Sequence, residues 1–177
     1  MKKYKVRIEG VSPLLVNNPE KTIFADETYK KQIGKTKGTP VKDLLYETKD
    51  GKLYQPSTHI EQALEKSSVN FKIPGKRGKT YKSLFQSFIT VEPKKIIHEN
   101  QDWEPYGTSV VIQRNRVWKE RPMLENWALT FNIVNLNEDV VPSEVIKEAI
   151  EYAGAFGGLG DWRPKFGMFK VTEFQPQ

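Results

Sequence analysis

The sequence predicts an α+β fold in which an antiparallel sheet carries two amphipathic helices on one face. Several segments alternate apolar and polar residues as strands do, two segments have the apolar spacing of helices, and no repeat of solenoid length occurs. The chain has 177 residues, of which 37% are hydrophobic and 28% are charged. This size and composition are typical of one globular domain. We therefore expect a single domain over residues 1–177.

Strands are expected wherever apolar and polar residues alternate along the chain. The clearest alternation runs from Trp127 to Ile133, whereas the run that follows Leu84 is interrupted by Pro93. The polar residues 120–125 are the right length for a hairpin connection, so the strands on either side of them are expected to pair at the centre of the sheet. The expected strands cover residues 4–9, 84–97, 109–119, 126–135 and 168–174.

Two helices are expected where apolar residues recur three and four positions apart. The first is expected to begin at Thr58, because Thr58 and Glu61 have the spacing of a capping box. The second is expected to begin with Ser143 as its cap and to end at Gly154. Both helices are short and amphipathic, which is typical of helices that pack on one face of a sheet.

The expected order of elements is strand, helix, strand, strand, helix, strand. This βαββαβ order is that of ferredoxin-like and RRM-like folds, and it would leave the second face of the sheet free to bind a ligand. Residues 17–55 and 69–105 do not fit the order and are expected to be insertions, one of them forming a β-hairpin arm. The first insertion is expected to be a long polar loop with a short hairpin that turns at residues 49–51.

Composition excludes several classes of site. The chain has no cysteine, so disulfides, thiolate zinc sites, iron–sulfur clusters and cysteine nucleophiles are excluded. The first ten residues lack the apolar run of a signal peptide, and no run of apolar residues reaches the length of a membrane span. We expect a cytoplasmic protein that binds neither a membrane nor a cofactor or metal.

Positive charge is concentrated in one segment of the chain. The formal net charge is +6, and residues 69–82 hold several cations and no acid, which favours a polyanionic partner. Tyr81 adds an aromatic ring on which a base could stack. The alternative is an ordinary solvated loop. The cations of this segment are Lys72, Lys76, Arg77, Lys79 and Lys82, of which Lys76, Arg77 and Lys79 are the expected contacts to nucleic acid.

A second group of candidate residues lies in the strand around residue 116. Strict alternation would place Arg114, Arg116 and Trp118 on one face of the strand. Two guanidinium groups and an indole in a row are suited to the phosphates and bases of a single strand. The alternative is an exposed sheet face on which these side chains form cross-strand ion pairs.

A glycine-rich segment from Gly157 to Gly167 joins the last helix to the last strand. Glycines allow backbone amides to approach a phosphate, and basic and aromatic side chains lie beside them. In the structural alternative, the glycines form a tight connection and the tryptophan fills the core. The candidate binding residues here are Gly158, Gly160, Trp162, Arg163 and Lys165.

The segment from Gly158 to Phe169 resembles the glycine-rich loop of the RAMP superfamily, which comprises the RNA-binding subunits and guide-RNA-processing nucleases of CRISPR systems. The opening strand followed by residues 10–15 is also similar to the start of many such proteins, including small RAMP-like proteins of phages and prophages. The resemblance implies a ferredoxin-like fold, binding to single-stranded RNA, and head-to-tail stacking of subunits with a protruding hairpin. Residues 84–118 are the expected hairpin.

The resemblance also raises the question of catalysis. The nucleases of the superfamily often use a histidine, and His59, at the start of the first helix, is a candidate general base. The alternative is a surface histidine with no catalytic role. His98 lies near Glu99 and Asp102, which is either a weak metal-binding group or an ordinary polar loop.

We therefore predict a non-catalytic protein that binds single-stranded RNA or DNA and coats the strand as a homo-oligomer. One alternative is a metal-independent endoribonuclease of the type that processes CRISPR RNA. Another is a structural subunit of a ribonucleoprotein complex.

Overall fold

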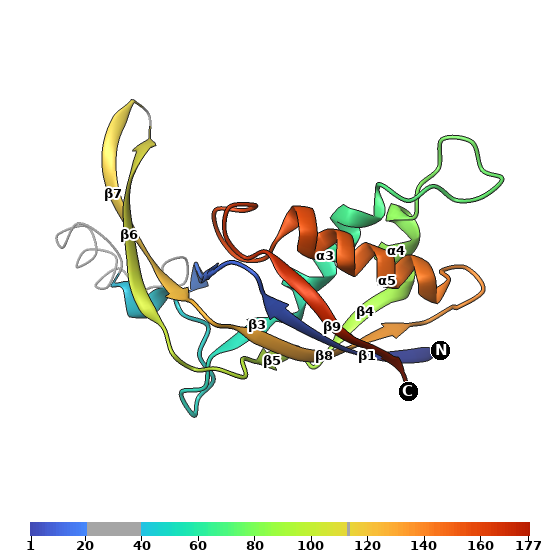
Figure 1. Cartoon of the computed structure of the whole chain (residues 1–177), viewed down its shortest axis with the longest axis horizontal. Coiled ribbons are helices and arrows are strands. Elements are labelled where there is room, and N and C mark those ends of the chain that lie inside the picture. The colour runs from blue at the N-terminus through green and yellow to red at the C-terminus, as the bar shows by residue number, and fades with distance from the viewer. Residues whose placement is uncertain (21–39, 113) are drawn as a thin grey trace.

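The structure is a computed structural model that describes residues 1–20, 40–112 and 114–177. An antiparallel sheet with the strand order β4-β8-β1-β9 lies at its centre (Figure 1). The two ends of the chain are neighbours, because β1 and β9 pair along their length. The fold class is α+β with antiparallel sheets, as predicted. The four strands are β1 (Lys2–Gly10), β4 (Ile89–Glu92), β8 (Ala128–Asn135) and β9 (Phe169–Pro176).

The α-helices of the described residues cover one face of this sheet (Figure 1). They are α3 (Ser57–Ser68), α4 (Lys82–Phe88) and α5 (Ser143–Tyr152), and α5 continues into a π-helical turn, η2 (Ala153–Gly157). The core lies between the helices and the sheet, since alternate residues of the strands and one stripe of each helix are buried together. Its fully buried side chains include Val6, Ile8, Ile60, Leu64, Ile146 and Ile150.

The helix ends differ from the predicted ones. Neither α3 nor α5 has a side-chain cap, because each begins directly after a proline, Pro56 or Pro142, that takes the capping position. The carboxylate of Glu61 accepts hydrogen bonds from the Val91 amide at 2.8 Å and the Thr90 hydroxyl at 3.0 Å, so it ties α3 to β4. The prediction that Gly154 ends the second helix was also wrong, since the chain stays helical to residue 157 and turns only afterwards.

A long β-hairpin extends away from the central sheet, and we call it the arm (Figure 1). It consists of β6 (Glu104–Ile112) and β7 (Asn115–Leu124), and β7 is joined at its base by the short β2 (Leu14–Leu15). The predicted pairing at the sheet centre was therefore wrong, because β7 pairs with β6 rather than with β8. Residues 120–125 are largely the second half of β7 and not a hairpin turn.

The predicted strand over residues 84–97 was wrong in its first half. Phe85 and Phe88 lie on helix α4, and Phe85 packs into the core. The second half forms β4 and then β5 (Lys95–Ile97), which pairs with β3 (Tyr54–Pro56). A 3₁₀ turn, η1 (Val41–Leu44), precedes them.

The first insertion contains the predicted short hairpin. Glu47 pairs with Leu53 across the turn, and Gly51 has a φ of 77°. The remainder of the predicted long loop, residues 21–39, lies outside the described residues. No helix in the described ranges is both long enough and apolar enough to pass through a lipid bilayer.

Candidate nucleic-acid interface

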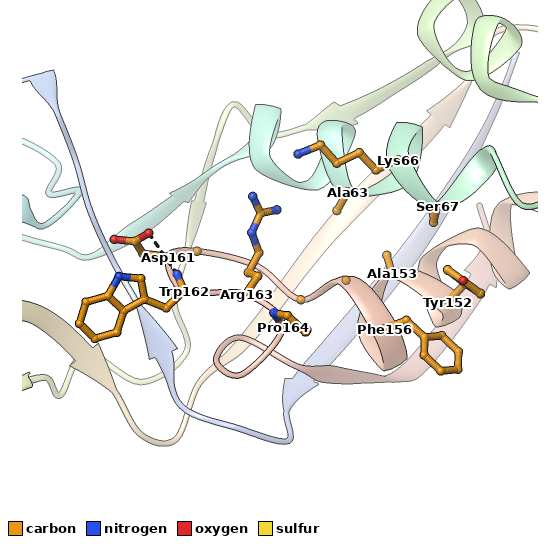
Figure 2. Close-up of a pocket in the computed structure, with 13 residues that line it drawn as sticks. Ala63, Lys66, Ser67, Tyr152, Ala153, Phe156, Asp161, Trp162, Arg163 and Pro164 are labelled. Atoms are coloured by element: carbon orange, nitrogen blue, oxygen red, sulfur yellow. Dashed lines mark hydrogen bonds between the residues drawn. The ribbon is translucent and has the colours of Figure 1, made fainter. Parts of the chain in front are cut away.

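A groove runs between helix α3 and the glycine-rich segment, and Figure 2 shows the side chains that line it. Its volume is about 530 Å³. The residues at its floor are small, with Ala63 and Ser67 on α3 facing Ala153 at the end of α5 (Figure 2). The groove is therefore open because the sequence places small side chains where two helical segments approach each other.

The glycines of this segment have structural roles. A Cβ atom on Gly160 would lie 2.2 Å from the Leu15 carbonyl oxygen, and one on Gly167 would lie 1.9 Å from the Leu159 carbonyl oxygen. Both residues also have φ values above 70°, which disfavour any side chain. The segment passes so close to neighbouring backbone that only glycine fits, as the structural alternative predicted.

The backbone amides of the segment are largely used within the protein. The amide of Gly158 donates to Ala153 at 2.8 Å, that of Asp161 to Leu15 at 2.8 Å, and that of Gly167 to Pro13 at 2.8 Å. The predicted role of Gly158 as an amide donor to phosphate is therefore wrong, because its donor already has a partner. The amides of Gly158, Asp161 and Gly167 are therefore not available to an anion in the groove.

Two cationic side chains reach into the groove from opposite walls. Arg163 extends from the glycine-rich segment toward α3, and Lys66 extends from α3 (Figure 2). Both are exposed, and neither forms an ion pair with any residue that the structure describes. Lys66 is absent from the sequence prediction, because a single lysine on a polar helix face carries no distinguishing pattern. These two cations give the groove an uncompensated positive charge.

Of the other predicted residues of the segment, Trp162 lines the groove and Lys165 does not. Trp162 is half-buried, and its ring packs edge-on against Tyr106 of the arm at 6.1 Å. The Trp162 ring therefore does not fill the core, and one of its edges is occupied by the arm. Lys165 is exposed and lies over the Phe166 ring, with 5.9 Å between Nζ and the ring centre. Phe156, which the prediction missed, is 65% exposed at the far end of the groove.

The base of the arm is attached to the glycine-rich segment. The guanidinium of Arg121 donates to the Asp161 carboxylate at 2.8 Å, and both side chains are largely shielded from solvent. The Tyr106 and Phe166 rings lie 5.3 Å apart beside this ion pair. These contacts hold the arm in a defined position relative to the groove.

The arm carries only part of the predicted row of side chains. Arg116 and Trp118 are both exposed on β7, but Arg114 lies in the turn with a φ of 68° and does not continue the row. Gln113, between them and β6, lies outside the described residues. The Trp118 indole rests on Gly107 of β6 and donates to Glu120 at 3.1 Å. It remains 63% exposed, so one face of the ring is open to a partner.

The basic loop between α3 and α4 lies at the other end of the molecule from the arm (Figure 1). Lys76, Arg77 and Lys79 are exposed on it, which agrees equally with a binding loop and with a solvated one. Tyr81 is only 5% exposed and packs in the core. The predicted stacking role of Tyr81 was therefore wrong, because its ring is not accessible to a base.

The face of the central sheet that the helices leave uncovered is not free for an anion. Its cations are paired across the strands, with Lys3 bound to Glu92 at 2.9 Å and Lys5 bound to Glu173 at 3.0 Å. Arg7 in β1 binds both Glu9 and Glu99. The prediction that this face of the sheet is free to bind nucleic acid was therefore wrong, because acids neutralise its cations.

His59 lies beside the groove in a second, smaller cavity. Its Nδ1 lies 2.6 Å from the Gln55 side-chain nitrogen, which is a donor, so Nδ1 accepts and Nε2 carries the ring proton. Burial lowers the pKa of His59, and the positive charge of Arg163 lowers it further. The ring is therefore held in its neutral form, and Gln55 occupies its Nδ1, which leaves Nε2 for contact with a ligand.

His98 forms no metal-binding group with the other residues that the structure describes. No group of three His, Cys, Asp or Glu residues among the described parts of the chain has the geometry to hold a metal ion. His98 is only 3% exposed, while Glu99 is paired with Arg7. Burial lowers the pKa of His98 to about 4, and its Nδ1 has no hydrogen-bond partner among the described residues.

This buried histidine predicts acid sensitivity. In the unfolded chain its pKa is near the ordinary value of 6.5, so between pH 6.5 and 4 the unfolded state binds the extra proton and stability falls as the pH falls. We expect a loss of about 2 kcal/mol between pH 7 and pH 5 from this one group. Urea unfolding at both pH values should show this fall in the free energy of unfolding for the parent protein. The fall should be much smaller in His98→Leu, whereas in His59→Leu it should be nearly as large as in the parent. Equal losses in the parent and His98→Leu would contradict this assignment.

No model of a known protein family matches the sequence, and no curated protein matches it. The fold, however, resembles a chain of type III-B Cmr-beta. The solved structure is a cryo-EM structure of type III-B Cmr-beta bound to cognate target RNA, and the TM-score to this chain is 0.62 at 12% identity. The match covers 99% of this chain and 60% of the other, so the protein spans about 60% of the length of this structural relative. At this level of identity the likeness is one of fold.

Proposed function

We propose that this protein is a non-catalytic, RNA-binding subunit of a ribonucleoprotein complex of the RAMP type. The observation that carries the proposal is the likeness of fold over 99% of the chain to a chain of type III-B Cmr-beta, whose structure holds cognate target RNA. This likeness supports the structural-subunit alternative better than a free homo-oligomer that coats single strands. It also favours RNA over DNA as the partner.

The sheet order supports a ferredoxin-like assignment for the central domain. With the arm, the smaller sheets and the additional helix α4 set aside, the chain runs β1, α3, β4, β8, α5, β9, and the strands lie in the order β4-β8-β1-β9. We assign this arrangement to the ferredoxin-like class, with residues 1–177 as one domain. The arm is then an insertion between the second and third strands of that motif.

The groove is the part of the surface best suited to an RNA strand. The sheet face is neutralised by ion pairs, whereas Lys66 and Arg163 face each other with no acidic partner in the part of the chain that the structure describes. A guanidinium and an ammonium on opposite walls would bind successive phosphates. Phe156, whose ring lies 4.7 Å from that of Tyr152, offers a platform for stacking at the end of the groove.

The arm is the part best suited to a neighbouring subunit or to RNA that leaves the groove. Beyond its base it is a two-stranded ribbon whose described side chains are exposed or half-buried, and such ribbons are marginally stable on their own. Val111 and Trp118 are 67% and 63% exposed, which is unusual for large apolar side chains. We expect a partner in the assembled complex to cover them, with Arg116 contacting phosphate.

The first test is the binding of labelled single-stranded RNA over a salt series, measured by fluorescence anisotropy. If Lys66, Arg163 and Arg116 each neutralise one phosphate, the logarithm of affinity should fall against the logarithm of salt with a slope of about −2. Duplex RNA should bind less tightly, because the groove receives a single strand. The RNA should be intact on a gel afterwards.

Two results would contradict this proposal. Absence of salt-dependent binding to any single strand would remove the RNA-binding role. Cleavage of the RNA that is lost in His59→Ala with binding retained would instead favour the endoribonuclease alternative.

A further inference from the structure

The cavity that contains His59 is continuous with the groove. Its volume is about 260 Å³, and it shares Gly160, Asp161 and Arg163 with the groove as wall residues. It lies between the start of α3 and the chain that follows β2. A strand held in the groove would therefore pass directly over its opening, with Arg163 at the boundary.

The lining of this cavity is hydrogen-bonding but nearly uncharged. Asn17 and Gln62 are exposed and provide side-chain amides at its mouth, and the buried Gln55 orients His59 at 2.6 Å. Asp161 is the only acid among the described wall residues, and it already accepts from Arg121 at 2.8 Å and from the Trp162 amide at 3.1 Å. Apart from Arg163 at the boundary with the groove, the described lining carries no cation, so it suits a neutral group with several donors and acceptors.

The walls also favour a flat group. The rings of Tyr46 and His59 meet edge to face at 5.5 Å and form one side. The wall also includes Gly160, which bears no side chain and whose backbone lies against Leu15. A planar ring with polar edges suits an aromatic wall of this kind and matches the hydrogen-bonding character of the cavity.

We propose that this cavity binds one nucleobase of the RNA whose phosphates lie at Lys66 and Arg163. The amides of Asn17 and Gln62 and the Nε2–H of His59 contact the hydrogen-bonding edge of the base. The neighbouring Arg163 holds the phosphate of the same nucleotide. This inference rests on the proposed RNA-binding function and adds a preference for one base to it.

The test compares labelled homopolymeric strands of A, C and U of equal length with an abasic ribose-phosphate strand of that length. The abasic strand keeps the phosphates and so reports on the groove alone. The parent protein should prefer one homopolymer over the other two by at least about fivefold, because a well-placed amide pair discriminates between bases to that extent. The abasic strand should bind most weakly.

The Asn17→Ala, Gln62→Ala double variant should reduce the preference to less than about twofold, while the salt dependence of binding stays unchanged. Gln86→Ala, which removes an exposed amide from α4, serves as the control and should keep the preference. Equal binding of all homopolymers by the parent, or a preference that survives in the double variant, would overturn the base pocket and leave RNA binding intact. Failure of every strand, abasic included, to bind would overturn the proposed function together with the pocket.

Discussion

Replacing Gly167 by alanine should destabilise the protein by about 3 kcal/mol or more. The new Cβ would lie 1.9 Å from the carbonyl oxygen of Leu159, which is backbone and cannot move aside without breaking the turn. The φ of 77° adds a conformational penalty of about 1 kcal/mol for a residue with a side chain. Urea unfolding monitored by circular dichroism would measure the change.

Gly157→Ala is the matched control for this experiment. Gly157 lies in the same segment, but a Cβ there meets nothing within 4 Å and its φ is not positive. Since glycine is unfavourable in a helical turn, the change should be neutral or stabilise the fold by up to about 1 kcal/mol. Similar unfolding midpoints for the two variants would show that the tight passage of the segment does not limit stability.

Removing both groove cations should weaken binding of single-stranded RNA by about 30- to 100-fold. Lys66 and Arg163 face the groove and form no ion pair with the described residues, so we expect each to make a charge-assisted contact with the RNA. One such contact contributes on the order of 1.5 kcal/mol, or about tenfold in affinity. The salt dependence of binding should also become shallower by about one unit or more. The measurement is a fluorescence-anisotropy titration of the Lys66→Ala, Arg163→Ala variant.

The control for this loss is the Lys3→Ala, Lys5→Ala double variant. It removes the same amount of positive charge, but from the sheet face, where each lysine is paired with a glutamate. We expect its affinity for RNA to stay within about threefold of the parent, because only long-range attraction changes. An equal loss in both variants would mean that net charge rather than the groove determines binding.

The spacing of apolar residues along the chain correctly predicted a strand and a helix without reference to the elements that pack against them. The alternation around Leu129 and Phe131 identified a buried strand, and the spacing in residues 145–150 identified the amphipathic helix α5. Both signals depend only on which side chains turn toward the core. The antiparallel α+β class followed from the order of these elements.

The pairing of a strand and the burial of a side chain depend on residues far away in the sequence, so they were not predictable from local spacing. Residues 109–119 alternate as a central strand would, yet they form the arm, because period-two spacing does not state which strand lies alongside. Tyr81 resembled a stacking residue by its position among lysines, but α4 turns it into the core. Residues 109–112 and 115–119 do lie in strands and Tyr81 does lie beside the basic loop, but the position of each in the folded protein differs from the predicted one.

By itself, the sequence determined the fold class, the basic character of the surface and the glycine-rich segment, since these depend on composition and local spacing. Only the tertiary structure decided where an anion can be held. Lysines of β1 are neutralised by acids that lie close to them only after folding. Lys66 and Arg163, about a hundred residues apart, come together with no acidic partner within residues 1–20, 40–112 and 114–177. Charge compensation acts over a few ångströms in space rather than along the chain, and folding alone sets those distances.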